Sequence, residues 1–338
     1  MNDQAERSTL SSTRHPLEVS GSVELAVLER SGMTESRHIG AAAVVSSDGA
    51  LLRSVGDVSA SVYPRSCLKP FQALTVLRSG VRLDGVQAVL ATASHAGTPD
   101  HQAVVTAMLE RIGATEDDLL CPPDWPYDRE TARTASTKRR IFMNCSGKHS
   151  SFLLACAENG WDAAHYDDLD HPLQVAARET VADYVGETID HAGVDGCGAP
   201  VFATTLAGLA RGVARLTHSA TTDADADAGH LVRAVLADPW ALDGHDRANT
   251  VTIEELGLLA KLGAEGVMVM GTTDGVAVAV KVLDGNLRAG TLTALHLLVA
   301  EGVVPQEDAD RVLARTLERV TGGGDLVGGI RAGAGLAV

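Results

Sequence analysis

The sequence predicts an α/β (α+β) fold, in which a mainly antiparallel sheet of N- and C-terminal strands has helices around it and a helical lobe. Three observations support this prediction. Strand-like segments lie toward both ends of the 338-residue chain, whereas helical segments fill the middle. Only 3% of the residues are aromatic, so aliphatic side chains must fill the core. No internal repeat or linker divides the chain, which predicts a single domain over residues 21–338 after a disordered tail at 1–20.

The predicted elements follow one another along the chain. Strands are expected at 23–32 and 38–57, with a tight turn at Ser47-Asp48-Gly49. The run 86–97 is aliphatic and ends at a strand-to-loop corner, and 219–229 is a low-complexity surface loop. A pair of strands is expected at 266–270 and 275–289, and the segments 291–302 and 307–320 close the fold. Helices are predicted at 67–80, 101–113, 148–160, 171–186, 228–238 and 252–263, with one more inside 194–216.

The charge and the cysteines exclude several classes of protein. A formal net charge of −16 and a pI near 5.1 argue against a nucleic-acid partner, which favours a basic surface. The first twenty residues contain no apolar run, so neither a secretion signal nor a membrane span is predicted, and a cytoplasmic location is expected. Five scattered cysteines indicate reduced thiols, with room for one metal site.

The chain has only five lysines among 28 basic residues, so each lysine is informative. Lys138 lies in an exposed basic patch, and Lys261 is assigned to the C-terminal end of a helix, where the helix dipole favours a cation. Lys69 follows Ser66 in the only Ser-x-x-Lys of the chain, a spacing that puts both side chains on one helix face. A lysine can activate a serine hydroxyl only if its pKa falls by about 3 units. A chance spacing is the alternative.

Two further lysines and a second serine lie in unusual surroundings. Lys281 has only aliphatic neighbours in a strand, so its ammonium must reach solvent, find a partner or lose its proton. Lys148 lies in "NCSGKH", a small-residue turn that opens a helix and is either a ligand-binding turn or a capping loop. Ser94 stands at the corner in "ASHAGTPDH" and is either a supporting hydroxyl or a plain turn residue.

Six motifs occur in the order found in one family. They are "PRSCLKPFQ", "ASHAGTPDH", "NCSGKH", "HPLQ", "VDGCGAP" with "FATTLAGLA", and "AEGV" with "VKVLDG". From about residue 22 onward the chain resembles the L-asparaginase II family, the Ser-Lys type of asparaginase. The resemblance implies a fold similar to serine β-lactamases and penicillin-binding proteins. It also implies that residues 21–338 are one catalytic domain that hydrolyses L-asparagine to aspartate and ammonia.

The resemblance also implies a role for individual residues. Ser66 with Lys69, and Ser94 with Lys281, look like two Ser-Lys tandems. The substrate-binding positions of the family match Arg65 and His149, with Asp195 as a partner for the substrate amine, and its zinc site matches Cys145, Lys148 and Cys197. Two thiolates and a neutral lysine are a reasonable donor set for zinc, although a lysine ligand is unusual. A homodimer is expected on the same grounds.

Two other functions fit parts of the pattern. The first is a β-lactam hydrolase or peptidase that uses the same Ser-x-x-Lys. Lys281 is followed by Val-Leu-Asp, however, and not by the Thr-Gly or Ser-Gly of those enzymes. The second is a non-catalytic protein that binds zinc or an amino acid and releases no ammonia.

Overall fold

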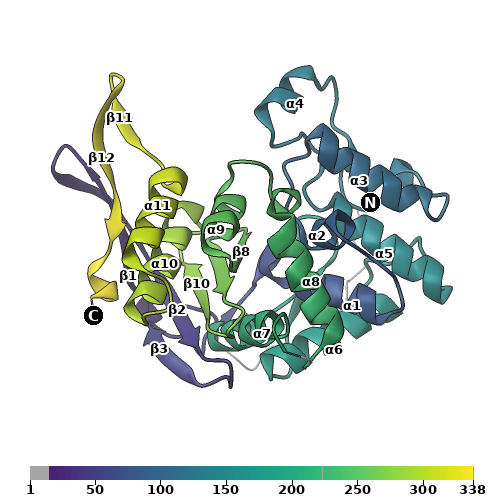
Figure 1. The fold of residues 1–338 in the computed structure, drawn as a ribbon, viewed down its shortest axis with the longest axis horizontal. Helices are drawn as coiled ribbons and strands as arrows, with labels where there is room; N and C mark the ends of the chain where they lie inside the picture. The colour runs from purple at the N-terminus through teal and green to yellow at the C-terminus, as the bar shows by residue number, and fades with distance from the viewer. Residues whose placement is uncertain (1–14, 223, 338) are drawn as a thin grey trace, which may run out of the picture.

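A large antiparallel sheet forms the left half of the molecule (Figure 1) in the computed structural model, which describes residues 15–222 and 224–337. Eight strands pair in the order β11-β12-β1-β2-β10-β9-β8, with β3 also paired to β2. The strands of this sheet are β1 Val23–Arg30, β2 Met33–Val45, β3 Leu51–Val55, β8 Leu259–Gly263, β9 Val267–Gly271, β10 Ala277–Val282, β11 Val320–Gly322 and β12 Asp325–Ala332. N-terminal β1 and β2 lie between C-terminal β12 and β10, which confirms the predicted fold class.

Helices cover both faces of the sheet and build a second, helical half at the right of Figure 1. Helix α7 packs on β2, β9 and β10, and α10 packs on β9, β10 and β12. On β9, Met268 faces α10 whereas Gly271 faces α7, and alternation along a strand puts these two residues on opposite faces. A side chain at Gly271 would place its Cβ 2.8 Å from Val213 of α7, so glycine permits this close approach.

The helices lie as follows, together with two short strand pairs. They are α1 Lys69–Arg78, α2 Val86–Thr92, α3 Pro99–Glu110, α4 Arg129–Thr134, α5 Ser146–Asn159, α6 Pro172–Val185, α7 Leu206–His218, α8 Ala226–Ala237, α9 Ala248–Leu256, α10 Gly290–Ala300 and α11 Gln306–Thr316. The short pairs are β4 Ser61–Val62 with β7 Thr204–Thr205, and β5 Ala192–Val194 with β6 Pro200–Phe202.

Four local predictions need correction. The run 86–97 is helix α2 up to Thr92 rather than a strand, and α8 begins at Ala226, inside the expected surface loop. The helix predicted at 252–263 ends at Leu256, because Gly257 takes a left-handed conformation (φ 63°) that stops it. Strand β8 follows and carries Lys261, which is therefore not at a helix end. Strand β12 was not expected.

In the part that the structure describes, the predicted tail begins at His15, and residues 15–20 are exposed except for Leu17. Most of the predicted tail, residues 1–14, lies outside the described residues. Leu17 is buried, and the backbone N–H of Ser61 donates to the carbonyl of His15. Among the helices of 15–222 and 224–337, none combines the length and the apolar character that crossing a bilayer requires.

Candidate active site

Ser94 lies between two lysine side chains that come from opposite halves of the molecule. Lys69, the first residue of α1, donates from Nζ to the Ser94 hydroxyl at 3.0 Å and to the Ala93 carbonyl at 2.5 Å. Lys261, on β8, donates from Nζ to the same hydroxyl at 2.9 Å and to the Leu262 carbonyl at 2.7 Å. Both lysines are buried. Their meeting point joins the sheet to the helical lobe.

Backbone hydrogen bonds fix the segment that carries Ser94. The N–H groups of Ser94 and Ala96 donate to the carbonyls of Leu242 and Asp243, and the N–H of His95 donates to Asn144. The His95 ring accepts from the N–H of Gly97 at Nδ1, so its Nε2–H donates to the Ser146 hydroxyl at 2.9 Å. Ser94 is therefore positioned by two separate parts of the chain, residues 242–243 and residues 144–146.

Lys261 has the properties of a proton acceptor. It has no solvent exposure, and burial, followed by the nearby charge of Lys69, lowers the pKa of Lys261 from 10.5 to about 8. A lysine with this pKa is partly neutral near pH 7 and can then accept a proton, whereas an ordinary lysine is almost fully charged. The geometry and the lowered pKa together make Lys261 a candidate base.

Ser66 lies in the turn that leads into α1. The 3-10 turn Arg65–Leu68 continues directly into the helix, and the Lys69 N–H donates to the Ser66 carbonyl. Positions 66 and 69 therefore share a face, as the sequence predicted. No hydrogen bond engages the Ser66 hydroxyl within the part of the chain that the structure describes.

Arg65 and Asp195 form an ion pair beside Ser66. The Nε of Arg65 donates to the Asp195 carboxylate at 2.6 Å, and both side chains are largely buried. Arg65 has a φ of 52°, a left-handed conformation that is uncommon for a residue other than glycine. Such strain often marks a functional position. The predicted substrate-binding residues Arg65 and Asp195 are thus brought together.

The other predicted residues gather around the N-terminus of α5. Cys145 precedes that helix, and Lys148, in its first turn, donates from Nζ to the Cys197 sulfur at 3.1 Å. A hydrogen bond from Cys145, with the charge of Lys148, lowers the pKa of the Cys197 thiol. His149 is fully buried, with its Nδ1 2.8 Å from the Tyr166 hydroxyl. His149 therefore lies next to Tyr166, near the cysteines and Lys148.

The donor set fits a zinc ion in chemistry. Zinc accepts thiolate readily, and the two thiols of Cys145 and Cys197 lie together with the Lys148 amine. Burial lowers the pKa of Lys148, but the charges of the neighbouring cysteines raise it by more, so the net effect is a raised pKa. A metal would therefore have to displace a proton from the Lys148 amine. Over residues 15–222 and 224–337, His, Cys, Asp and Glu side chains form no metal-binding group of three. Any zinc here therefore depends on Lys148.

Lys281 does not contact Ser94, so the predicted pair of Ser94 with Lys281 needs correction. The Nζ of Lys281 donates to the carbonyls of Glu265 and Val282, at the turn between β8 and β9. Lys261 holds the place beside Ser94, and sequence reasoning missed it because its segment was taken for a helix. The signal was available: after Gly257, the run Leu-Leu-Ala-Lys-Leu is as apolar as the other strands.

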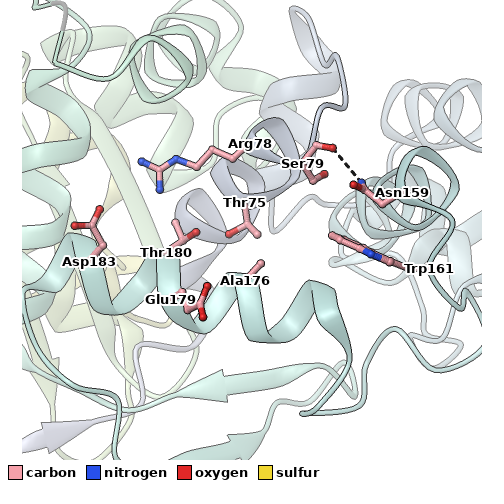
Figure 2. A pocket seen from close by; sticks show the side chains of 9 residues that line it. All are labelled: Thr75, Arg78, Ser79, Asn159, Trp161, Ala176, Glu179, Thr180 and Asp183. Atoms are coloured by element: carbon pink, nitrogen blue, oxygen red, sulfur yellow. Dashed lines mark hydrogen bonds between the residues drawn. The ribbon is translucent and has the colours of Figure 1, made fainter.

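A separate open pocket lies between α1, α6 and the end of α5 (Figure 2). Its volume is about 540 Å³, and Asn159 donates across it to the Ser79 carbonyl at 3.0 Å. Its lining residues are Thr75, Arg78, Ser79, Asn159, Trp161, Ala176, Glu179, Thr180 and Asp183. None of the predicted site residues lines it, so it is distinct from the Ser-Lys cluster.

A serine hydroxyl between two buried lysines is typical of an enzyme site rather than of a structural core. The family model for L-asparaginase II matches residues 26–332, and the chain belongs to that family. Membership implies a hydrolase. No curated protein matches the chain. A crystal structure of a β-lactamase from Mycobacterium bovis is similar at 18% identity, over 82% of this chain and 95% of that one, with a TM-score of 0.38.

Proposed function

We propose that the protein is an L-asparagine amidohydrolase that converts its substrate to L-aspartate and ammonia. The observation that carries the proposal is the position of Ser94 between Lys69 and Lys261. A second serine, Ser66, lies in the turn that leads directly into Lys69. Family membership supports amide hydrolysis as the reaction type.

Arg65 and Asp195 would recognise the two charges of a free amino acid. A guanidinium binds a carboxylate well, and a carboxylate accepts hydrogen bonds from an ammonium. The two groups lie 2.6 Å apart and form one ion pair with each other. A bound zwitterion can replace this pair by two, one between its carboxylate and Arg65 and one between its ammonium and Asp195. This arrangement favours a free amino acid over a residue within a peptide, which has no such pair of charges.

Ser66 is the better nucleophile of the two serines. The Ser94 oxygen already accepts hydrogen bonds from two lysines, whereas the Ser66 oxygen has no such partner within the described residues. Ser66 also lies one turn before Lys69, the lysine that bonds to Ser94. Its attack on the side-chain amide carbon would give an aspartyl ester and release ammonia, and water would then hydrolyse the ester.

Ser94 would act as the proton relay. Neutral Lys261 would take the proton of the Ser94 hydroxyl, and Lys69 would replace it with one of its own. The neutral Lys69 amine would then accept the Ser66 proton. With a pKa of about 8, Lys261 can take up a proton near neutral pH and return it to the leaving amine. Lys261 thus replaces Lys281 as the second lysine of the mechanism.

Zinc, the homodimer and the cytoplasmic location stay predictions. Cys145, Lys148 and Cys197 would hold the ion, which would supply positive charge next to the Asp195 loop. Metal analysis of the purified protein tests this part separately from activity.

A β-lactam hydrolase is the second candidate, because Lys261-Leu262-Gly263 resembles the Lys-Thr-Gly of those enzymes. Leu262 lacks the hydroxyl of that motif, which counts against it. Two assays separate the candidates: ammonia release from asparagine and glutamine, and hydrolysis of a chromogenic cephalosporin. Ammonia release without cephalosporin cleavage supports our proposal. Cleavage of the cephalosporin alone would overturn it.

A further inference from the structure

The turn between β8 and β9 holds a carboxylate in an unfavourable backbone conformation. Glu265 has a φ of 60°, and Gly266 follows with a φ of 70°. Glutamate has no special preference for the left-handed region, in contrast to glycine, asparagine or aspartate. Arg65 is also left-handed, and its Nη1 lies 3.9 Å from the Glu265 carboxylate, so two strained residues meet next to Ser66. Backbone strain of this kind clusters at functional sites.

Several contacts fix the Glu265 turn. Lys281 donates from Nζ to the Glu265 carbonyl, and the Val282 N–H donates to the Gly266 carbonyl at 2.8 Å. The Glu265 side chain also packs closely on Gly285: a Cβ added at Gly285 would lie 2.6 Å from Oε2 of Glu265. Lys281 therefore has a role in holding this turn, although it does not reach Ser94.

The Glu265 carboxylate lies near the Arg65 guanidinium, at a different nitrogen from Asp195. Its Oε1 lies 3.9 Å from Nη1 of Arg65, and its side chain is 66% exposed. Asp195 pairs with the same guanidinium at Nε. Two positive groups, Arg65 and Lys281, are thus matched by two negative groups, Asp195 and Glu265. These four side chains carry no net charge.

We propose that Glu265 determines specificity by charge, since it weakens binding of acidic amino acids relative to the neutral amide. This inference rests on the proposed function. L-asparagine is a neutral zwitterion, whereas the product L-aspartate carries one additional negative charge. Loss of the Glu265 charge would leave Arg65, Lys281 and Asp195 with one excess positive charge, which favours aspartate. Glu265 then limits product inhibition.

The expected effect is modest because the carboxylate is exposed. For a separation of roughly 7 Å in a water-like dielectric, one like-charge interaction changes affinity by about threefold at low salt. Screening reduces this effect at high ionic strength, because the Debye length falls to about 3 Å at 1 M salt. Salt dependence therefore distinguishes a charge effect from a change in shape.

The test compares Glu265→Gln with wild type. The ratio of the aspartate Ki to the asparagine KM should fall about threefold at low salt, and the difference should disappear in 1 M salt. Glu307→Gln makes the same change in net charge on exposed α11 and should leave this ratio at its wild-type value. An unchanged ratio in Glu265→Gln, or an equal fall in Glu307→Gln, overturns the proposal.

Calorimetry with L-aspartate separates this proposal from the proposed function. A tighter aspartate Kd in Glu265→Gln supports the charge effect even if wild type releases no ammonia. Equal binding by both forms, or no binding by either, contradicts it. Absence of ammonia release by wild type contradicts the proposed function alone.

Discussion

Replacement of Lys261 by methionine should reduce kcat for ammonia release by about 10²- to 10⁴-fold, the usual contribution of a general base. Methionine has a similar length but cannot exchange protons. Lys261 is the lysine beside Ser94 whose pKa is lowered to about 8, so its loss removes the acceptor at the end of the relay.

The magnitude follows from the pKa of Lys261. At pH 7, a lysine with a pKa of about 8 is about 10% neutral, whereas a lysine at 10.5 is about 0.03% neutral. Burial therefore increases the reactive form about 300-fold. For wild type, kcat/KM should rise with pH and level off above about 8, and the methionine variant should lack this rise.

Folding of the variant is checked by its thermal midpoint. The folded-state pKa of Lys261 lies below its unfolded value, so the folded protein binds fewer protons between pH 8 and 10.5, and stability rises with pH across that window. Removal of this buried charge should therefore not lower the Tm at pH 7. Lys138→Met, at an exposed position, is the matched control. A folded Lys261→Met that turns over like wild type would refute the reasoning.

Other predictions concern substrate binding and the segment of Ser94. Asp195→Asn should raise KM for asparagine at least about tenfold, with a smaller change in kcat, because a charged hydrogen bond to the substrate amine is lost. Steady-state kinetics measure this effect, and an unchanged KM would contradict the role of Asp195. His95→Leu should destabilise the fold by about 1–3 kcal/mol in urea unfolding, because the Gly97 N–H loses its acceptor. His95→Gln should recover part of that loss, and equal stability of all three forms would exclude a structural role for the ring. Cys197→Ser should lower the zinc content of the purified protein, whereas Cys156→Ser, away from the donor set, should not; equal metal contents contradict the predicted site.

Part of the site could be predicted from local sequence. The spacing of Ser66 and Lys69 predicts a shared face, and the structure has one because a single turn joins them. The pair of Arg65 with Asp195 spans 130 residues, so only a family resemblance could suggest it. Local patterns do not encode such distant contacts.

The errors have physical causes. The helical period seen at 252–263 continues past Gly257, but that glycine ends the helix, and the next residues pair with β9 instead. Strand β12 contains Gly328 and Gly329, which have low strand propensity, and it forms because β1 offers a partner edge. Tertiary pairing decided both segments.

The most direct test of the mechanism is the identity of the acylated serine. Protein mixed with L-asparagine, quenched in acid and digested, can be mapped by mass spectrometry. Our account predicts an aspartyl ester on Ser66, absent from Ser66→Ala, which should also release no ammonia. An ester on Ser94, or wild-type ammonia release by Ser66→Ala, would contradict it.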